Sequence, residues 1–207
     1  MNDFNRAVDW ILSHTASRRL ERRICFVPCW KAGSCRKVRL QYFGDGNAAD
    51  FWPMTAGVQI AGIDLGFRHA SWFQRLGMPD ALLAKLAPFL GLRGLQARDA
   101  LAKAGRTILS EGEMKALLKA YAKGMLEECR KAVTTLDSMP DEAQTALLSF
   151  AVDCGTSVLS TRPDLLEALQ KRRFIEAGEI LKEGSSSWGL DWMHLYEEGV
   201  LLDRAGR

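Results

Sequence analysis

The sequence changes character near Phe67, and this change limits the folds open to the chain. From Ile24 to Ile63, short β-prone runs are separated by turn-forming Gly, Pro, Asn and Asp residues. After Phe67, apolar residues recur at helical spacing, interrupted by helix caps and stop signals. The pattern predicts an α+β, mostly α fold, in which a small irregular β region near the N-terminus lies beside a helical lobe. Such an arrangement favours a cleft, where polymeric substrates bind.

Turn and cap residues set the boundaries that we expect for individual elements. An amphipathic helix is expected from Asp3 to about Ser17, because its apolar residues recur at helical spacing. Capping boxes at Ser110 and Thr161 predict that helices begin there. The β-prone runs are 24–30, 37–43 and 57–63. The later helices are expected over 79–91, 95–105, 111 to about 137, 140–155, 162 to about 183 and 190–204, with the serines of 185–187 as a linker.

The sequence contains no internal repeat and no low-complexity tract. We therefore expect a single domain over residues 1–207. Residues 1–66 would supply the N-terminal helix and the β region, and residues 67–207 the helical lobe.

The net charge of +3 is unevenly distributed along the chain. Residues 1–40 contain nine Lys or Arg and three Asp or Glu, a charge of +6, so residues 41–207 carry −3. A basic segment of this kind favours an anionic partner: nucleic acid, a membrane surface or an acidic polymer such as a cell wall. A solvated basic surface without a partner explains the pattern equally well.

The five cysteines cannot all pair within the chain, because their number is odd. Cys25, Cys29 and Cys35 cluster, but no fourth ligand stands nearby, so we predict no metal site and no cofactor. The cluster contains free thiols, or a disulfide if the protein works outside the cytoplasm.

The first residues, MNDFNRAVDW, lack the basic start and apolar core of a signal peptide. No apolar run reaches the roughly 18 residues that a membrane span needs. We therefore expect the chain to be made in the cytoplasm. A separate secretion or lysis system would have to deliver it to the periplasm or the cell wall.

One stretch, TAGVQIAGIDLGFR at residues 55–68, carries a resemblance to a known family. It resembles the SGVTIG-x-G-x-DLG signature of the pesticin-like lysozymes, which are muramidases of the T4-lysozyme superfamily found as bacteriocin domains, phage enzymes and secreted antibacterial effectors. Two later stretches agree in the right order. LAPFLGLRGLQARDAL at 86–101 is similar to the family's py-x-GLkG-x-A stretch, and QTALLSFAVDCGTSVL at 144–159 to its qaALvsfaFNlGtg helix. The resemblance covers roughly residues 52–160 and implies a lysozyme-like fold.

The resemblance implies a set of site residues, with departures from the family pattern. Asp64 matches the aspartate of the DLG motif, whereas the family's catalytic threonine falls on Gln59, five positions before Asp64 rather than six. The Asn of the FNlG helix falls on Asp153, as a substrate contact. The family's catalytic glutamate ends the first helix; Glu21 is the only carboxylate between Asp9 and Asp45 and is its nearest equivalent. The aromatic ring of Trp52, beside the expected cleft, would stack on a sugar.

Cleavage of a glycosidic bond needs one protonated carboxyl group and a second, ionised carboxylate. Asp64 suits the second role, since hydrogen bonds from glycine amides favour the charged form of a carboxylate, and small neighbours would let a sugar approach the backbone. The alternative is that Asp64 is an N-cap for the segment beginning at Phe67. Glu21 would be the general acid, yet it lies in RRLERR, where cations favour ionisation; the alternative is a surface ion pair.

Two further candidates have alternatives that need no substrate. Gln59 could orient a water molecule, as a hydroxyl group would, or it could be a strand residue facing solvent. Trp30, Trp52 and Trp72 could contact sugar, but packing in the core is the commoner use of tryptophan.

These observations favour a muramidase that cleaves the glycan strands of bacterial peptidoglycan, as an antibacterial effector or a phage-type lysin. Its partners would be the glycan strands and an immunity or delivery protein. The alternative is a catalytically degenerate lysozyme-like protein that binds glycan or a protein partner. A nucleic-acid binder using the basic residues 18–39 is a third hypothesis, which no recognisable motif supports.

Overall fold

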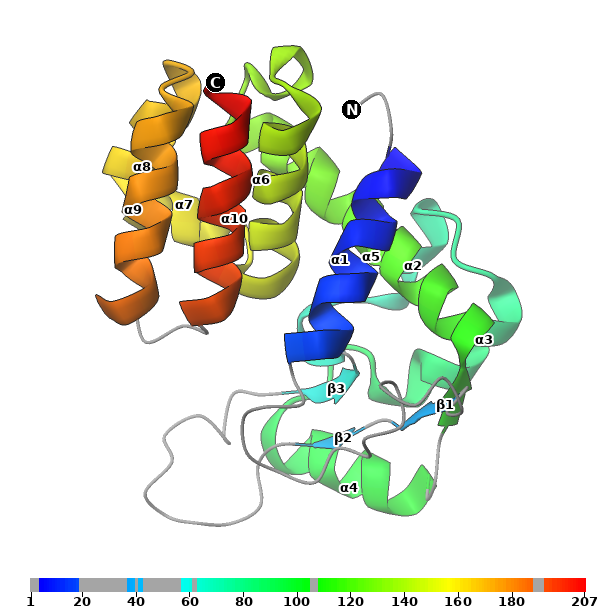
Figure 1. The fold of residues 1–207 in the computed structure, drawn as a ribbon. Coiled ribbons are helices and arrows are strands. Elements are labelled where there is room, and N and C mark those ends of the chain that lie inside the picture. Colours follow the sequence, from blue (N-terminus) through cyan, green and yellow to red (C-terminus); the bar gives the residue numbers. More distant parts are fainter. Residues whose placement is uncertain are drawn as a thin grey trace. The chain divides into compact units, whose positions relative to one another are not determined.

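The structure, a computed structural model, describes residues 4–18, 37–39, 41–42, 57–60, 63–104, 108–187 and 192–207 (Figure 1). The chain divides into two compact units. The first, here called the sheet unit, spans Arg23–Tyr121, and the second, here called the helical unit, combines Met1–Arg22 with Ala122–Arg207. The described residues are mostly helical with a few short strands, which confirms the predicted α+β, mostly α class. The single domain expected from the sequence stays a prediction.

The sheet unit contains a three-stranded antiparallel sheet. Its strands are β2 (Gln41–Tyr42), β3 (Val58–Ile60) and β4 (Ile63–Asp64), in that order. The apolar residues of β3 and β4 are buried in the core of the unit. Strand structure is thus confirmed in the expected runs 37–43 and 57–63, but the run 57–63 is a pair of strands rather than one, because β3 ends at Ile60 and the antiparallel β4 begins at Ile63. The run 24–30 lies outside the described residues.

A second, two-stranded sheet pairs β1 (Lys37–Arg39) with β5 (Ile108–Ser110). The prediction that strands are confined to the N-terminal region is therefore wrong. β5 follows a helix and is only three residues long, so its own sequence carries little strand signal. Pairing with β1, far away in the chain, gives it strand geometry, and Leu109 anchors it in the core.

The sheet unit also contains three short helices and two 3-10 turns among its described residues. They are α2 (Ala70–Arg75), α3 (Asp80–Leu86) and α4 (Gly94–Ala104), with the 3-10 turns η1 (Leu65–Phe67) and η2 (Ala87–Phe89). The helix predicted over 79–91 is shorter than expected, because α3 ends at Leu86 and η2 at Phe89. Gly91, with a φ of +75°, follows two residues after η2 and does not itself end a helix. The helix α4 lies against β2 and β3 (Figure 1) and buries Ala97.

The helix α5 (Glu111–Ala132) begins at the capping box predicted at Ser110. The Ser110 amide donates to Glu113 Oε2 at 2.7 Å, and the Glu113 amide donates back to Ser110 Oγ at 3.2 Å. The prediction that this helix continues to Asp137 is wrong. The chain turns after Ala132, and Asp137 accepts a hydrogen bond from Arg130 Nε at 2.9 Å across the turn.

The helical unit packs helices from both ends of the chain. They are α1 (Phe4–Arg18), α6 (Asp141–Cys154), α7 (Ser157–Thr161), α8 (Pro163–Gln170), α9 (Phe174–Ser187) and α10 (Trp192–Ala205). The expected bounds of α1, α6 and α10 are confirmed within a few residues, and Gly155, with a φ of +79°, ends α6 as predicted. Within the described ranges, no helix is both long and apolar enough to cross a bilayer.

The single helix predicted over 162 to 183 is wrong, because the chain breaks between α8 and α9. At the break, the Arg173 amide donates to Ala168 O at 2.8 Å and the Arg172 amide to Leu169 O at 3.0 Å. This is a Schellman closure, which needs a left-handed residue. Arg172 fills that position with a φ of +58°, so no glycine marks the break in the sequence.

Two smaller expectations about the same region are also corrected. Thr161 does not cap α8; its hydroxyl donates to Val158 O at 2.8 Å within α7, and Pro163 occupies the first turn of α8. The serines at 185–187 belong to α9 rather than to a linker.

Two glycines allow α9 and α10 to pack closely side by side (Figure 1). A Cβ atom placed on Gly199 would lie 2.7 Å from Gly178 O and 2.7 Å from Lys182 Cγ, and one on Gly178 would lie 2.5 Å from Asp203 Oδ1. At this contact Lys182 donates to Asp203 at 2.8 Å and to Glu179 at 2.6 Å, and these hydrogen bonds raise the pKa of Lys182. The close approach therefore brings a half-buried ion pair between the helices.

We expect Gly199→Ala to destabilise the protein by about 1–3 kcal/mol, the usual cost of overpacking, although alanine favours helix. The matched control is Gly112→Ala in the first turn of α5, where an added Cβ atom meets nothing within 4 Å. The control should be neutral or stabilising by up to about 1 kcal/mol. Urea unfolding followed by circular dichroism measures both changes, and equal stability of the two variants would contradict the packing argument.

A pH dependence follows from Glu113. The Ser110 amide, and then the Lys85 ammonium at 3.0 Å, hold the pKa of Glu113 below its ordinary value of 4.5. A lowered pKa in the folded state adds stability above pH 4.5, which is lost as the pH falls through the folded-state value. Glu113→Gln, which can still complete a capping box, should be less stable than the parent at pH 7, and this difference in stability should shrink as the pH falls below 4.5. A gap that is independent of pH in urea unfolding would show that the charge of Glu113 contributes nothing.

Candidate functional site

Asp64 lies at the junction of β4 and η1 in the sheet unit. It is the last residue of β4 and the N-cap of η1, with extended backbone angles of φ −84° and ψ 111°. The Gly66 amide donates to its Oδ1 at 2.8 Å, and the Gly57 amide donates to both Oδ1 and Oδ2 at 3.1 Å. The half-buried carboxylate is thus held by glycine amides, as expected. It is also an N-cap, as in the alternative, but of the turn that begins at Leu65 and ends at Phe67 rather than of a segment that begins at Phe67.

Glycine is required at both donor positions because two backbone segments touch there. A Cβ atom on Gly57 would lie 2.3 Å from Asp64 Oδ1 and 2.4 Å from Gly66 N. One on Gly66 would lie 2.6 Å from Leu92 O and 2.7 Å from Gly57 Cα. Atoms of the protein itself fill these spaces, so the expectation that these small residues leave room for a sugar is wrong for Gly57 and Gly66.

The register of the sheet brings Gln59 and Asp64 together. In the antiparallel pairing of β3 with β4, Gln59 lies opposite Asp64 and Ile60 opposite Ile63. Because Ile60 and Ile63 are buried, the register is fixed by the core. The side chain of Gln59 lies outside the described residues, so its role stays a prediction.

The other predicted site residues are not tested by the described part of the chain. Glu21, Trp30 and Trp52 lie outside it. Asp153 belongs to α6 in the helical unit, but its side chain also lies outside the described residues.

Trp72 belongs to a cluster of rings and a cation. Its ring meets Phe73 edge-on at 4.8 Å and Tyr121 at 5.8 Å, and the Arg68 guanidinium lies 4.6 Å from its centroid. Trp72 is half-buried and packs within this cluster, so it is not a core residue, and its contact with sugar stays a prediction. The contact of Arg68 with this ring was not predicted from the sequence.

A second pair of a ring and a cation lies directly after Asp64. Phe67, the last residue of η1, is 53% exposed, and the Arg93 guanidinium lies 4.4 Å from its ring centroid. Arg93 Nε donates to Gly66 O at 3.3 Å. Neither Phe67 nor Arg93 was predicted as a site residue. A usable signal was present, because Phe67 directly follows the DLG motif and Arg93 lies in the second matching stretch.

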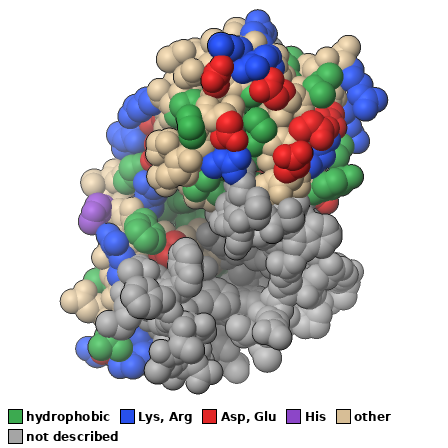
Figure 2. Space-filling view, turned by 90° about the vertical axis from the view of Figure 1, so that its left-hand side faces the viewer, with side chains coloured by type: hydrophobic (Ala, Val, Ile, Leu, Met, Phe, Trp, Pro, Cys, Tyr) green, Lys and Arg blue, Asp and Glu red, His purple; other side chains and the backbone are tan. Residues whose placement is uncertain are grey.

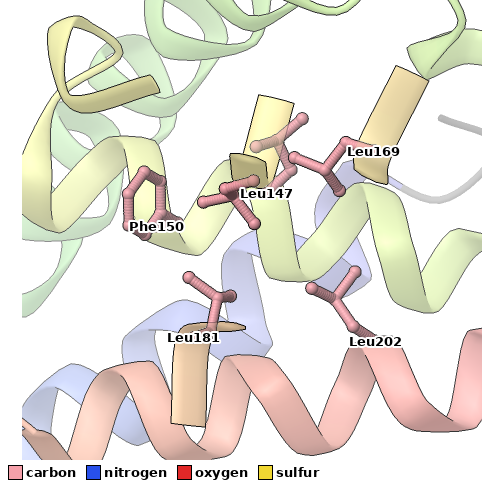
Figure 3. A pocket seen from close by; sticks show the side chains of 6 residues that line it. Leu147, Phe150, Leu169, Leu181 and Leu202 are labelled. Atoms are coloured by element: carbon pink, nitrogen blue, oxygen red, sulfur yellow. The ribbon is translucent and has the colours of Figure 1, made fainter. Parts of the chain in front are cut away.

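The helical unit contains a small apolar pocket of about 10 Å³ between α6, α8, α9 and α10, where the lining side chains point toward one another (Figure 3). The lining residues are Leu147, Phe150, Leu165, Leu169, Leu181 and Leu202. A water molecule needs roughly 10–15 Å³ and polar partners. This pocket is therefore a gap in the core and no place for a substrate.

Charged side chains of both signs mix on the described part of the face in Figure 2. Ion pairs also occur where α8 ends: Glu167 of α8 pairs at 2.7 Å with Lys171 and at 3.2 Å with Arg173, both in the turn that follows the helix. A mixed surface lacks the single-sign field that attracts nucleic acid. The side chains of the basic segment 18–39 lie outside the described residues.

Other chemistries find little support among the described residues. No group of three or more His, Cys, Asp or Glu in that part of the chain could hold a metal ion. Burial raises the pKa of the Cys129 thiol to about 12, so Cys129 would be a poor nucleophile at neutral pH. The anchored carboxylate of Asp64 is the feature best suited to chemistry.

The sequence model of one family matches residues 35–175, which is more than half of the chain. The family is Pesticin, described as a bacterial toxin homologue of phage lysozyme, C-terminal part. The match includes Gln59, Asp64 and Asp153 and begins after Glu21. No curated protein matches the chain.

We expect Gly57→Ala to displace the Asp64 carboxylate, because the new methyl group would collide with Asp64 Oδ1 and Gly66 N. The expected loss is about 1–3 kcal/mol in urea unfolding, with faster hydrogen exchange of the Gly66 amide. Gly77→Ala is the control, because Gly77 has a φ of +81° but open space around it, so that variant carries backbone strain alone. Unchanged exchange of the Gly66 amide in Gly57→Ala would contradict the proposed packing.

Proposed function

Since the chain belongs to the pesticin family of bacterial toxins homologous to phage lysozyme, we propose that it is a muramidase that cleaves the glycan strands of bacterial peptidoglycan. The observation that carries the proposal is the anchored carboxylate of Asp64. Two backbone N–H groups, on Gly57 and Gly66, hold it at the end of a strand, within the stretch that matches the family.

The hydrogen bonds distinguish the two oxygen atoms of Asp64. Oδ1 accepts from both Gly57 and Gly66, whereas Oδ2 accepts from Gly57 alone among the described residues. A carboxylate oxygen has two lone-pair sites, so Oδ2 keeps one for a ligand. In our proposal, this oxygen activates a water molecule or stabilises the oxocarbenium-like transition state.

The remaining roles are proposed from the sequence. Glu21 would protonate the leaving oxygen as general acid, and Gln59, opposite Asp64 in the sheet, would orient the water molecule. Trp52 and Asp153 would contact the sugar chain. The substrate lies outside the cytoplasm, so we also propose delivery by a separate secretion or lysis system. A toxin of this kind would need an immunity protein in its producer.

A catalytically degenerate binding protein is the second candidate. Two observations favour it: Gln59 replaces the family's threonine, and Asp64 has a structural role as the N-cap of η1. Turnover of purified peptidoglycan by the wild-type protein would exclude this candidate.

We expect Asp64→Asn and Glu21→Gln each to reduce cleavage of peptidoglycan by a factor on the order of 100 or more, the usual effect of removing a catalytic acid or base. Asparagine keeps an oxygen acceptor for the Gly57 and Gly66 amides, so Asp64→Asn tests charge with little change in packing. Asp99→Asn is the matched control, because Asp99 is an exposed acid paired with Arg98. Zymograms and mass spectrometry of the released fragments report both the rate and the linkage. Full activity of both variants would refute the assignment.

A further inference from the structure

We propose that Phe67 and Arg93 form a carboxylate-binding shelf beside Asp64, which holds an acidic group of the peptide-bearing sugar next to the bond to be cleaved. This inference rests on the proposed function, since it names how the same site would recognise its substrate.

The shelf is built in advance of binding. Arg93 is held on two sides, by the Phe67 ring at 4.4 Å and by Gly66 O, which accepts from Nε at 3.3 Å. An aromatic face and a carbonyl group together restrict the rotamers of a long side chain, which lowers the entropy lost when a ligand binds. Arg93 is therefore better organised than an ordinary surface arginine.

The charge of Arg93 is available to a ligand. Among the residues that the structure describes, no carboxylate lies within ion-pair distance of its guanidinium group, and its exposed side chain reaches solvent. Its Nε is engaged by Gly66 O, which leaves the Nη1 and Nη2 groups. These two can bind a carboxylate bidentately, the geometry for which arginine is suited.

Gly66 connects the shelf to the proposed reacting group. Its N–H donates to Asp64 Oδ1 at 2.8 Å, and its C=O accepts from Arg93. A single residue thus fixes both the carboxylate and the guanidinium group, so a ligand bound on one is held at a constant position relative to the other. This link is what separates Arg93 from arginines elsewhere on the surface.

The side chains of the shelf indicate which kind of ligand it binds. Phe67 is still 53% exposed beside Arg93, so it offers an apolar ring to a sugar or an alkyl chain. A ring and a free guanidinium group side by side fit a ligand that combines an apolar surface with a carboxylate. Peptidoglycan offers this combination, since its sugars carry short peptides with carboxylate groups.

The test compares two forms of purified peptidoglycan sacculi, native and with carboxylates converted into N-methylamides by carbodiimide and excess methylamine. Binding is measured by sedimentation in the cold. We expect the wild-type protein to bind the amidated sacculi about tenfold more weakly than the native ones, the usual effect of losing a hydrogen-bonded charge. Arg93→Gln should bind both forms equally weakly, because the partner of the carboxylate is gone.

Two further variants make the result specific. Arg98→Gln removes an exposed arginine of α4 that pairs with Asp99, and it should keep the full difference between the two forms. Arg93→Lys keeps the charge but loses the bidentate geometry of the guanidinium group. Its binding to native and amidated sacculi should therefore differ less than that of the wild type. Circular dichroism confirms that each variant is folded.

The possible results distinguish a failure of the shelf proposal from a failure of the proposed function. If the wild type binds native sacculi and Arg93→Gln retains the tenfold difference, the shelf is refuted while the proposed function stands. If the wild type binds neither form, both proposals fail. This experiment measures binding, so its result does not depend on whether Asp64→Asn loses cleavage activity.

Discussion

Two backbone N–H groups converge on the carboxylate of Asp64, and the surrounding turn is arranged to allow it. The Gly57 amide comes from the start of β3 and the Gly66 amide from η1, so the carboxylate joins two segments that are separate in the sequence. The collision of any Cβ atom at either position explains why both are glycine. The end of the β3–β4 pair, the start of the 3-10 turn η1 and the close approach of Leu92 O to Gly66 all meet at this one set of hydrogen bonds.

Several helix boundaries were predicted correctly from local signals, although the capping box at Thr161 did not form. The Ser110 capping box and the Gly155 stop act on their own helices, and both were confirmed. Two of the wrong predictions concern positions where the residue type itself carries no signal. Arg172 takes a left-handed conformation that its residue type does not signal, and β5 exists because β1 pairs with it. In these places distant packing determines the backbone, and no nearby residue reveals it.

The candidate site likewise has features that the sequence predicted and features that it did not. A family motif and a lone acid in an apolar run were enough to select Asp64 and the glycine amides that hold it. The cation beside it was not foreseen, because Arg93 reaches Gly66 and Phe67 from a different part of the chain. Spacing along the sequence cannot show such a contact. The same limit applies to Gly57 and Gly66. Their neighbouring space is filled by other atoms of the protein, so it does not leave room for a sugar.

A structural role for Asp64 does not compete with a catalytic one. An N-cap needs only an oxygen atom that accepts from the first turn, and Oδ1 supplies it at 2.8 Å. Oδ2 receives one shared N–H, so a lone pair remains. Fixing one oxygen atom to the backbone orients the other, and a preoriented charge avoids the reorganisation that a mobile side chain would need during the reaction. The cap that makes Asp64 necessary for the fold is thus also what would make it effective on a sugar.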